Sequence, residues 1–246
     1  MIIAIDAGNT RIKWGVFDGA KWISLGVLST SNALQLADVS AAWPEKAPVV
    51  ACNVAGRTVE TAINASLSPR APILWLRSST DACGVRNSYE SPESLGADRW
   101  AALIGARKLT RGPSLVVCAG TATTVDWLDA SGVFRGGLIL PGLELMYTSL
   151  ASNTVQLPLV SERHPSREPR NTQDAIVSGC LQAQIGAMEK MFSRIRSDPA
   201  AICLMTGGAA QSIAPHLEIP SRVEENMILD GLVYYHSIVL RQAIPA

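Results

Sequence analysis

The chain has 246 residues, of which 48% are hydrophobic and 17% are charged. This composition excludes an intrinsically disordered chain, which needs low hydrophobicity and a high net charge. The 21 basic and 21 acidic residues cancel, so no basic excess indicates a nucleic-acid or anionic membrane partner.

The cysteines and the N-terminal residues indicate in which cellular compartment the protein is expected. The five cysteines are odd in number and no two are spaced as Cys-x-x-Cys, which favours reduced thiols over a disulfide framework or a zinc site. The N-terminal MIIAID lacks a basic signal region and reaches Asp6 at once. No apolar run approaches the roughly 20 residues that cross a bilayer. We therefore expect a cytoplasmic protein with no membrane partner and no nucleic-acid ligand.

The first half of the chain is predicted to open as a meander of three strands. Asp18-Gly19 is a hairpin signal between the second strand and the third. A helix is expected to run from Ser31-Asn32, which offer capping oxygens, to about Trp43. The predicted strands are Met1–Ile5, Ile12–Phe17, Trp22–Leu28, Pro48–Cys52 and Ile73–Leu76, and the other helices are Arg57–Ser66 and about Ala97–Leu109.

The second half repeats the pattern of strand, Gly/Thr turn, strand, turn and strand, which indicates an ancient duplication. We expect two domains, residues 1–112 and 113–246, and a mobile Pro/Arg-rich loop at Pro158–Pro169. The predicted strands are Ser114–Cys118, Val125–Leu128, Phe134–Leu140 and Ala201–Thr206, and the predicted helices are Leu143–Leu150, Thr172–Ile195 and Asn226–Ala243.

The turn from Asp6 to Thr10 follows an apolar strand. Gly8 permits close approach of a ligand to the backbone, and Asn9 and Thr10 add short polar side chains. Asp6 can hold Mg²⁺ directly or through water, and Lys13 can counter phosphate charge. An ordinary hairpin with Asx-type turn bonding is the alternative for this segment by itself.

A second polar turn, from Cys118 to Thr124, follows another apolar strand and contains Gly120 and three threonines. Two such turns, one in each half, are expected to face each other across a central cleft and to grip a polyphosphate. Paired glycines at 136–137 and 207–208 lie beside strand ends, where they would let a nucleotide approach the backbone, but tight helix–strand packing is the favoured explanation for them alone. The sequence contains neither the Walker pattern nor G-x-G-x-x-G.

Asp98 and Arg99 lie where a loop becomes a helix. The simplest interpretation of Asp98 is a first-turn acid that completes a cap after Ser94. The functional interpretation is a base that accepts a proton from a hydroxyl, with Arg99 holding a carboxylate.

Together these motifs resemble those of type III pantothenate kinases over nearly the whole chain. The resemblance rests on D-A-G-N-T-x-x-K at 6–13, G-A-D-R at 96–99, G-T-A-T-T-V-D at 120–126, G-G-x-I-x-P-G at 136–142 and T-G-G at 206–208. It implies an α/β fold of two related actin-like (ribonuclease H-like) domains with mixed sheets. It also implies a homodimer that uses ATP and Mg²⁺ to convert pantothenate to 4'-phosphopantothenate, the first step of coenzyme A biosynthesis.

The resemblance implies a role for particular residues. Asp98 corresponds to the general base on the pantothenate hydroxyl, and Thr172 is the expected contribution of the partner subunit to the substrate pocket. The implied substrate-binding residues are Tyr89, Gly96, Ala97, Asp98, Arg99 and Thr172. The implied ATP-binding residues are Asp6, Ala7, Gly8, Asn9, Thr10, Arg11, Ile12, Lys13 and Thr121, with Asp6 also supporting Mg²⁺.

One position departs from the family pattern. The family usually has Asp where this chain has Cys118, and that Asp binds a monovalent cation such as K⁺ or NH₄⁺. A neutral thiol is a poor ligand for a hard cation, so we expect the cation site to be lost. Two alternatives remain open: a regulatory or transcription accessory homologue without turnover, and another actin-like enzyme such as a sugar kinase or a phosphatase.

Overall fold

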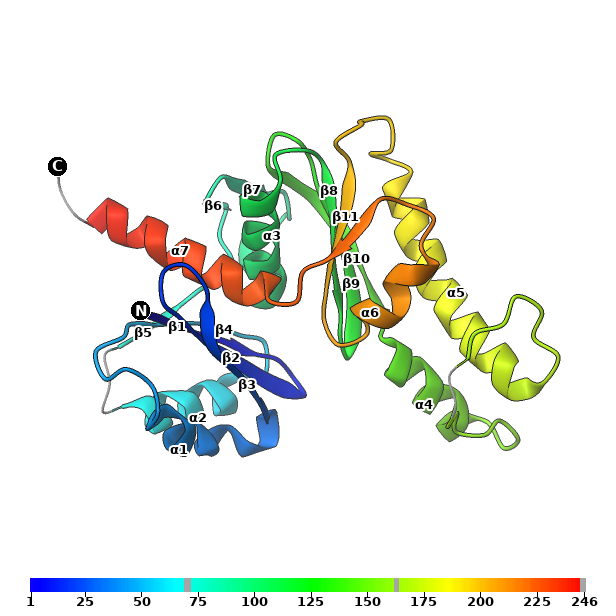
Figure 1. The fold of residues 1–246 in the computed structure, drawn as a ribbon, viewed down its shortest axis with the longest axis horizontal. Helices are drawn as coiled ribbons and strands as arrows, with labels where there is room; N and C mark the ends of the chain where they lie inside the picture. Colours follow the sequence, from blue (N-terminus) through cyan, green and yellow to red (C-terminus); the bar gives the residue numbers. More distant parts are fainter. Residues whose placement is uncertain (69–71, 162–163, 244–246) are drawn as a thin grey trace. The chain divides into compact units, whose positions relative to one another are not determined.

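The computed structural model describes residues 1–68, 72–161 and 164–243 (Figure 1). Contacts divide the chain into two compact units. Unit 1 comprises Met1–Arg111, Gly132–Phe134 and Asn226–Ala246, and unit 2 comprises Gly112–Ser131 and Arg135–Glu225. In the part of the chain described, no helix is both long and apolar enough to span a membrane.

Unit 1 is built on a five-stranded sheet in the order β3-β2-β1-β4-β5. Strands β1 to β3 form the predicted antiparallel meander, and β4 and β5 add in parallel beside β1. The hairpin signal at Asp18-Gly19 is confirmed, because Asp18 Oδ1 accepts the N–H groups of Ala20 and Lys21 at 2.8 Å. The strands are β1 (Ile2–Ala7), β2 (Arg11–Phe17), β3 (Trp22–Ser29), β4 (Val49–Asn53) and β5 (Ile73–Trp75).

One face of this sheet packs on short helices. Ile3 and Ile5 point to the same face of β1 and pack against Leu36 and Ile63 in one buried cluster. The helices are η1 (Thr30–Gln35), α1 (Leu36–Ser40) and α2 (Arg57–Leu67). The predicted helix from Ser31 to Trp43 is therefore wrong in detail: the segment divides into η1, inside which Asn32 has a non-helical backbone, and the short α1, which ends at Ser40.

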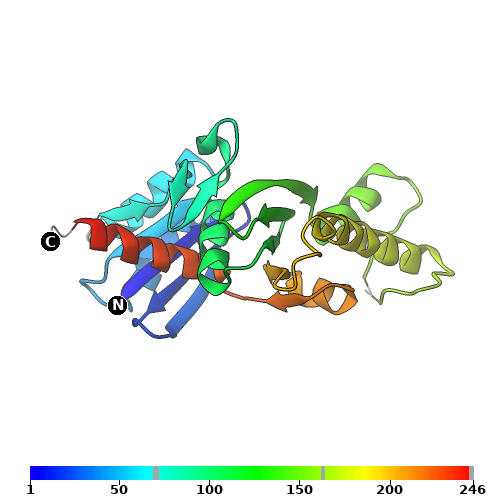
Figure 2. The ribbon, with the colours of Figure 1, turned by 90° about the horizontal axis from the view of Figure 1, so that it is seen from above.

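The other face is covered by two longer helices that lie side by side, α3 (Ala97–Leu109) and α7 (Met227–Ala243) (Figures 1 and 2). The backbones of the two helices are in direct contact. A Cβ at Gly231 would lie 1.9 Å from the backbone oxygen of Ala101, and a Cβ at Gly105 would lie 2.2 Å from the backbone oxygen of Met227. Only glycine fits these crossings. Residues 226–246, which the predicted boundary assigned to the second domain, therefore make their contacts in unit 1.

A small strand pair completes unit 1. Strand β6 (Asp81–Ala82) and β7 (Val85–Asn87) form an antiparallel pair, and β7 runs parallel to the first residues of β10 (Val133–Pro141). These two strands escaped sequence analysis because two or three residues are too few for a periodic pattern. The 3₁₀ segment η2 (Pro92–Ser94) follows and leads into α3.

The strand order of unit 2 repeats that of unit 1. Its strands run in the order β10-β9-β8-β11-β12, with β9 antiparallel and β11 parallel to the central β8. This repeated order supports the duplication expected from the sequence. Besides β10, the strands are β8 (Ser114–Ala119), β9 (Ala122–Leu128), β11 (Ile202–Thr206) and β12 (Ser221–Val223).

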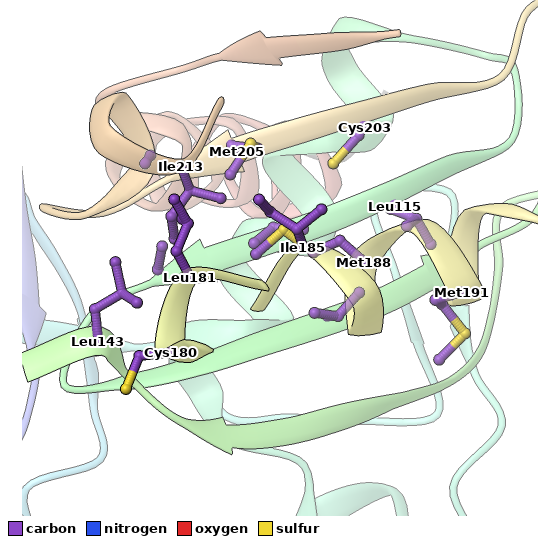
Figure 3. Packing of buried hydrophobic residues seen from close by; sticks show 14 of the residues in the cluster. Leu115, Leu143, Cys180, Leu181, Ile185, Met188, Met191, Cys203, Met205 and Ile213 are labelled. Atoms are coloured by element: carbon purple, nitrogen blue, oxygen red, sulfur yellow. The ribbon is translucent and has the colours of Figure 1, made fainter. Parts of the chain in front are cut away.

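Helices cover one face of the unit 2 sheet. Leu181, Ile185 and Met188 of α5 pack on strand residues such as Leu115 and Met205, as Figure 3 shows. Burial of each side chain of this size stabilises the fold by roughly 1.5–3 kcal/mol. The helical segments are α4 (Leu143–Asn153), α5 (Thr172–Phe192), α6 (Ala210–Ile213) and η3 (Ala214–His216).

Candidate active site

Asp6 is a buried carboxylate near the end of β1, with 7% of its surface exposed. Its neighbours across the sheet are Lys13 on β2 and Cys52 on β4. The thiol of Cys52 lies 3.5 Å from Asp6 Oδ1 and donates to it. Burial, and next the negative charge of Asp98, raise the pKa of Asp6 from 3.8 to about 6, against the opposing effect of Lys13.

The turn after Asp6 is closed by the backbone N–H of Gly8, which donates to Arg11 O at 3.0 Å. Thr30 holds the turn from the side: its hydroxyl donates to Gly8 O at 2.6 Å and its N–H donates to Thr10 O at 3.1 Å. No sequence motif indicated this role for Thr30. Ala7 and Ile12 are buried, so within the predicted ATP segment the exposed turn residues are Asn9, Thr10 and Arg11.

Asp98 lies in the first turn of α3, after the N-cap residue Gly96. No side chain caps this helix, so the interpretation of Asp98 as part of a cap after Ser94 is wrong. Instead, Asp98 Oδ1 accepts the N–H of Arg99 at 2.8 Å. Burial raises the pKa of Asp98, while this hydrogen bond and the charge of Arg99 lower it. The carboxylate is therefore a stronger base than an exposed aspartate.

Arg99 is 5% exposed and lies against two aromatic rings. Its guanidinium carbon is 5.7 Å from the ring centroid of Tyr89 and 5.8 Å from that of Phe134. Arg99 Nη1 also donates to the Tyr89 hydroxyl at 3.1 Å. The predicted residues Tyr89, Asp98 and Arg99 thus belong to one cluster, and Phe134 is a member that sequence analysis missed.

Three glycine-containing segments meet at the end of the unit 2 sheet. Gly142 N–H donates to Thr121 O at 2.9 Å, and a Cβ at Gly142 would lie 2.1 Å from Gly120 O. Gly207 has φ 102°, and a Cβ there would lie 2.4 Å from Ala119 O. Close packing therefore explains Gly207, although the neighbour is strand β8, whereas a Cβ at Gly136 would meet nothing within 4 Å. The Gly120–Thr121 turn is exposed.

Cys118 lies in the row of residues that crosses this sheet, between Thr206 on β11 and Thr124 on β9. The Thr206 hydroxyl donates to Glu225 O at 3.0 Å. The hydroxyls of Thr123 and Thr124 are buried without a hydrogen-bond partner among the residues described. A buried hydroxyl without a partner costs stability.

Thr172 is the first residue of α5 in unit 2, and its side chain is exposed. It lines an open cavity of about 400 Å³ between α4 and α5, together with apolar residues such as Met146, Leu150 and Ile176. The N-cap Asn171 accepts the N–H of Asp174 at 2.8 Å and holds this end of the helix.

The donor set of unit 1 is suited to a metal ion that is shared with phosphate. No cluster of three or more His, Cys, Asp or Glu able to hold a metal occurs among residues 1–68, 72–161 and 164–243. Mg²⁺ in kinases is bound by one or two carboxylates, with phosphate and water completing the shell. Asp6, a carboxylate next to the Gly8–Arg11 turn, can supply one such ligand when it is ionised.

Comparison with known proteins decides the family. The profile of the family "Type III pantothenate kinase" matches residues 2–194. This chain belongs to the type III pantothenate kinase family. The type III pantothenate kinase of Aromatoleum aromaticum is 53% identical over 234 residues, covering 94% of this chain and 96% of that protein. The enzyme of Dechloromonas aromatica is 48% identical over 233 residues, covering 94% and 97%.

Solved structures confirm the predicted fold class of this family member. A putative Baf family transcriptional activator from Campylobacter jejuni matches with a TM-score of 0.62 at 20% identity, covering 98% of this chain and all of that one. A putative 2-dehydro-3-deoxygalactonokinase from Sinorhizobium meliloti gives 0.61 at 14% identity, with complete coverage of both chains. The two units are therefore of the actin-like, ribonuclease H-like kind. At these identities the likeness shows the fold alone, so the similarity to the Campylobacter jejuni protein does not favour a regulatory role.

Proposed function

We propose that this kinase phosphorylates pantothenate with ATP through a site in which Asp98 acts on the pantothenate hydroxyl. The observation that carries the proposal is the cluster at the start of α3. There a carboxylate of raised pKa lies next to a buried guanidinium that Tyr89 and Phe134 hold in place. Phosphoryl transfer depends on positioning and charge stabilisation, and this cluster supplies a fixed base beside a fixed cation.

Each residue of the cluster has a role in this proposal. Asp98 orients the attacking hydroxyl and accepts its proton, as its raised pKa favours. Arg99 pairs with the pantothenate carboxylate, because a planar guanidinium matches a carboxylate with two hydrogen bonds. Tyr89, Gly96 and Ala97 form the wall around it.

The ATP phosphates are assigned to the two polar turns. The segment from Asp6 to Lys13 supplies backbone donors, the exposed side chains of its turn and the charge of Lys13. Thr121 lies on the exposed turn of unit 2. Asp6 would hold Mg²⁺, whose chemistry is to neutralise the charge on the phosphates.

The monovalent cation is the part of the family chemistry that this chain does not fit, since Cys118 offers a thiol where a hard cation requires oxygen. We assign this enzyme a site without K⁺ dependence. The Thr123 and Thr124 hydroxyls, which are buried and unpartnered among the described residues, are better suited to accompany phosphate than to replace a charged ligand.

The proposed assembly is a homodimer in which Thr172 reaches the substrate pocket of the partner. The exposed face of α5 supports it, because this face carries small residues, Ala175, Gly179, Ala183 and Gly186, on which a second helix can pack closely. A Cβ at Gly179 or Gly186 would meet nothing within 4 Å. Gly179→Arg should yield a monomer by light scattering, whereas Ala65→Arg on the exposed face of α2 should leave the dimer intact. A monomeric wild-type enzyme with full activity would overturn this assembly.

The decisive experiment for the reaction is the release of ADP that depends on added pantothenate, measured with the purified protein and Mg-ATP. We expect turnover with pantothenate and none without it, and 4'-phosphopantothenate as the product. We place the reaction in the cytoplasm, where ATP is supplied. A protein that binds ATP yet never phosphorylates pantothenate would contradict the proposal.

A further inference from the structure

Asn87 ends strand β7 and is buried, with 7% of its surface exposed. Its side-chain amide is engaged at both atoms. The oxygen Oδ1 accepts the backbone N–H of Tyr89 at 3.0 Å, and the nitrogen Nδ2 donates to the backbone oxygen of Pro92 at 3.0 Å. One buried amide therefore ties together the two ends of the segment that carries Tyr89.

This tie extends to the start of α3. The oxygen of Pro92 also accepts the N–H of Leu95 at 3.3 Å, and Leu95 is buried immediately before Gly96. Between β7 and α3 the only helical or strand element is the three-residue η2. Because the backbone of this segment has no strand partner to fix it, the Asn87 amide takes the place of one.

The ring of Tyr89 is fixed from the same place in the fold. Asn87 and Phe134 are paired residues of the parallel strands β7 and β10. The rings of Phe134 and Tyr89 lie 5.2 Å apart, and both contact Arg99. Asn87, which holds the Tyr89 backbone, is thus the strand partner of Phe134, which packs against the Tyr89 ring.

We infer that Asn87 is a positioning residue for pantothenate: it acts through Tyr89 and, by way of Pro92, through the Gly96–Arg99 segment, without touching the substrate. The inference rests on the proposed function of that segment. The two hydrogen bonds of the Asn87 amide lie within the pantothenate cluster. Their loss should therefore weaken pantothenate recognition and leave the ATP-binding turn of unit 1 unchanged.

The first test compares the two Michaelis constants. Asn87→Ala removes both side-chain hydrogen bonds, which leaves the half-buried Tyr89 N–H without this partner and the Pro92 oxygen with only the Leu95 N–H. It should raise the KM for pantothenate about tenfold. The KM for ATP should stay within about twofold of the wild-type value, since the Gly8–Arg11 turn is held by Thr30 instead. Asn64→Ala removes an exposed amide that accepts from Trp75 at 3.3 Å, and should change neither constant.

The second test asks whether Asn87 acts through Tyr89. In a double-mutant cycle with Tyr89→Ala, the loss of kcat/KM for pantothenate in the double variant should fall well short of the product of the single losses. Asn87→Asp keeps the acceptor for the Tyr89 N–H, but it replaces the donor to Pro92 with an oxygen that faces the Pro92 oxygen. It replaces Asn87→Ala in the cycle if alanine prevents folding.

A purely structural role for Asn87 has a different signature. It would raise both Michaelis constants together, or lower the melting temperature with no change in either, and the cycle would be multiplicative; any of these results would overturn the inference. Failure of the proposed function is separate, because it would appear as wild-type protein that does not phosphorylate pantothenate.

Discussion

Asp6 and Cys118 are the fifth residues of two six-residue strands, β1 and β8, that occupy the same central place in the sheets of their units. Each strand has an antiparallel neighbour on one side and a parallel neighbour on the other. The duplicated architecture therefore carries a carboxylate at this place in unit 1 and a thiol in unit 2.

This difference predicts how the enzyme responds to salt. The initial rate of the wild-type protein should depend little on K⁺, and Cys118→Asp should introduce or sharpen that dependence by restoring a charged oxygen ligand. The measurement is initial rate against added KCl at constant ionic strength, with a bulky organic cation as the replacement salt. Steep activation of the unaltered protein by K⁺ would show that the residue at 118 does not decide the matter.

Asp98→Asn tests the base. The amide is nearly isosteric with the carboxylate and can still accept the Arg99 N–H, but it cannot accept a proton. Loss of a general base costs roughly 10²–10⁴-fold in rate, so kcat should fall by that order while the circular dichroism spectrum persists. Asp38→Asn, at an exposed acid of α1, is the matched control. Wild-type turnover by Asp98→Asn would remove Asp98 from this role.

Asp6→Asn should separate stability from activity. The pKa of Asp6 is raised from 3.8 to about 6 in the folded protein. Its carboxyl therefore contributes stability that is fully present below pH 3.8 and is lost as the pH rises through about 6. Above that pH the buried charge lowers the free energy of unfolding, by on the order of 2 kcal/mol.

The expected result is a variant that unfolds at higher urea concentration than the wild type at pH 7.5, in buffer free of metal ions and ATP, and that has lost kinase activity. At pH 4 the two proteins should unfold at similar urea concentrations, because Asp6 is then largely protonated. If Asp6→Asn were less stable than the wild type at pH 7.5, the burial of Asp6 would not be the dominant effect.

Gly142→Ala tests the exposed turn of unit 2. The added Cβ would lie 2.1 Å from Gly120 O, so the backbone around Thr121 must shift. We expect the KM for ATP to rise by about tenfold or more, because displacement of a binding group by an ångström is costly. Unchanged ATP kinetics in Gly142→Ala would take Thr121 out of the ATP site.

Much of the fold could be predicted because its longer elements carry clear local signals. The meander at the N-terminus, the start of α3 at Ala97 and the start of α5 at Thr172 follow from alternation, turn residues and apolar runs. Strands β6, β7 and β12 could not be predicted, since pairing with distant segments fixes elements of two or three residues. The same holds for α7, whose sequence predicts a helix but not that it packs in unit 1.

The candidate site shows the same division. Asp6, Asp98 and Arg99 lie in short motifs and are visible in the sequence. Thr30 and Phe134 are not, because each contributes through a contact with residues at least 20 positions away. The Asn87 amide belongs with them: nothing in its sequence neighbourhood distinguishes it from an ordinary turn asparagine.

The placement of α7 has a consequence for synthesis of the protein. Translation makes this helix only after all of unit 2, yet it covers the sheet face to which Asp6 belongs. A nascent chain that has passed residue 225 contains every residue of unit 2 but lacks one of the two long helices of unit 1. Premature termination before Met227 would therefore leave unit 2 complete. The sheet of unit 1, although made first, would lack α7 on the face to which Asp6 belongs, and that part of the face would be open to water.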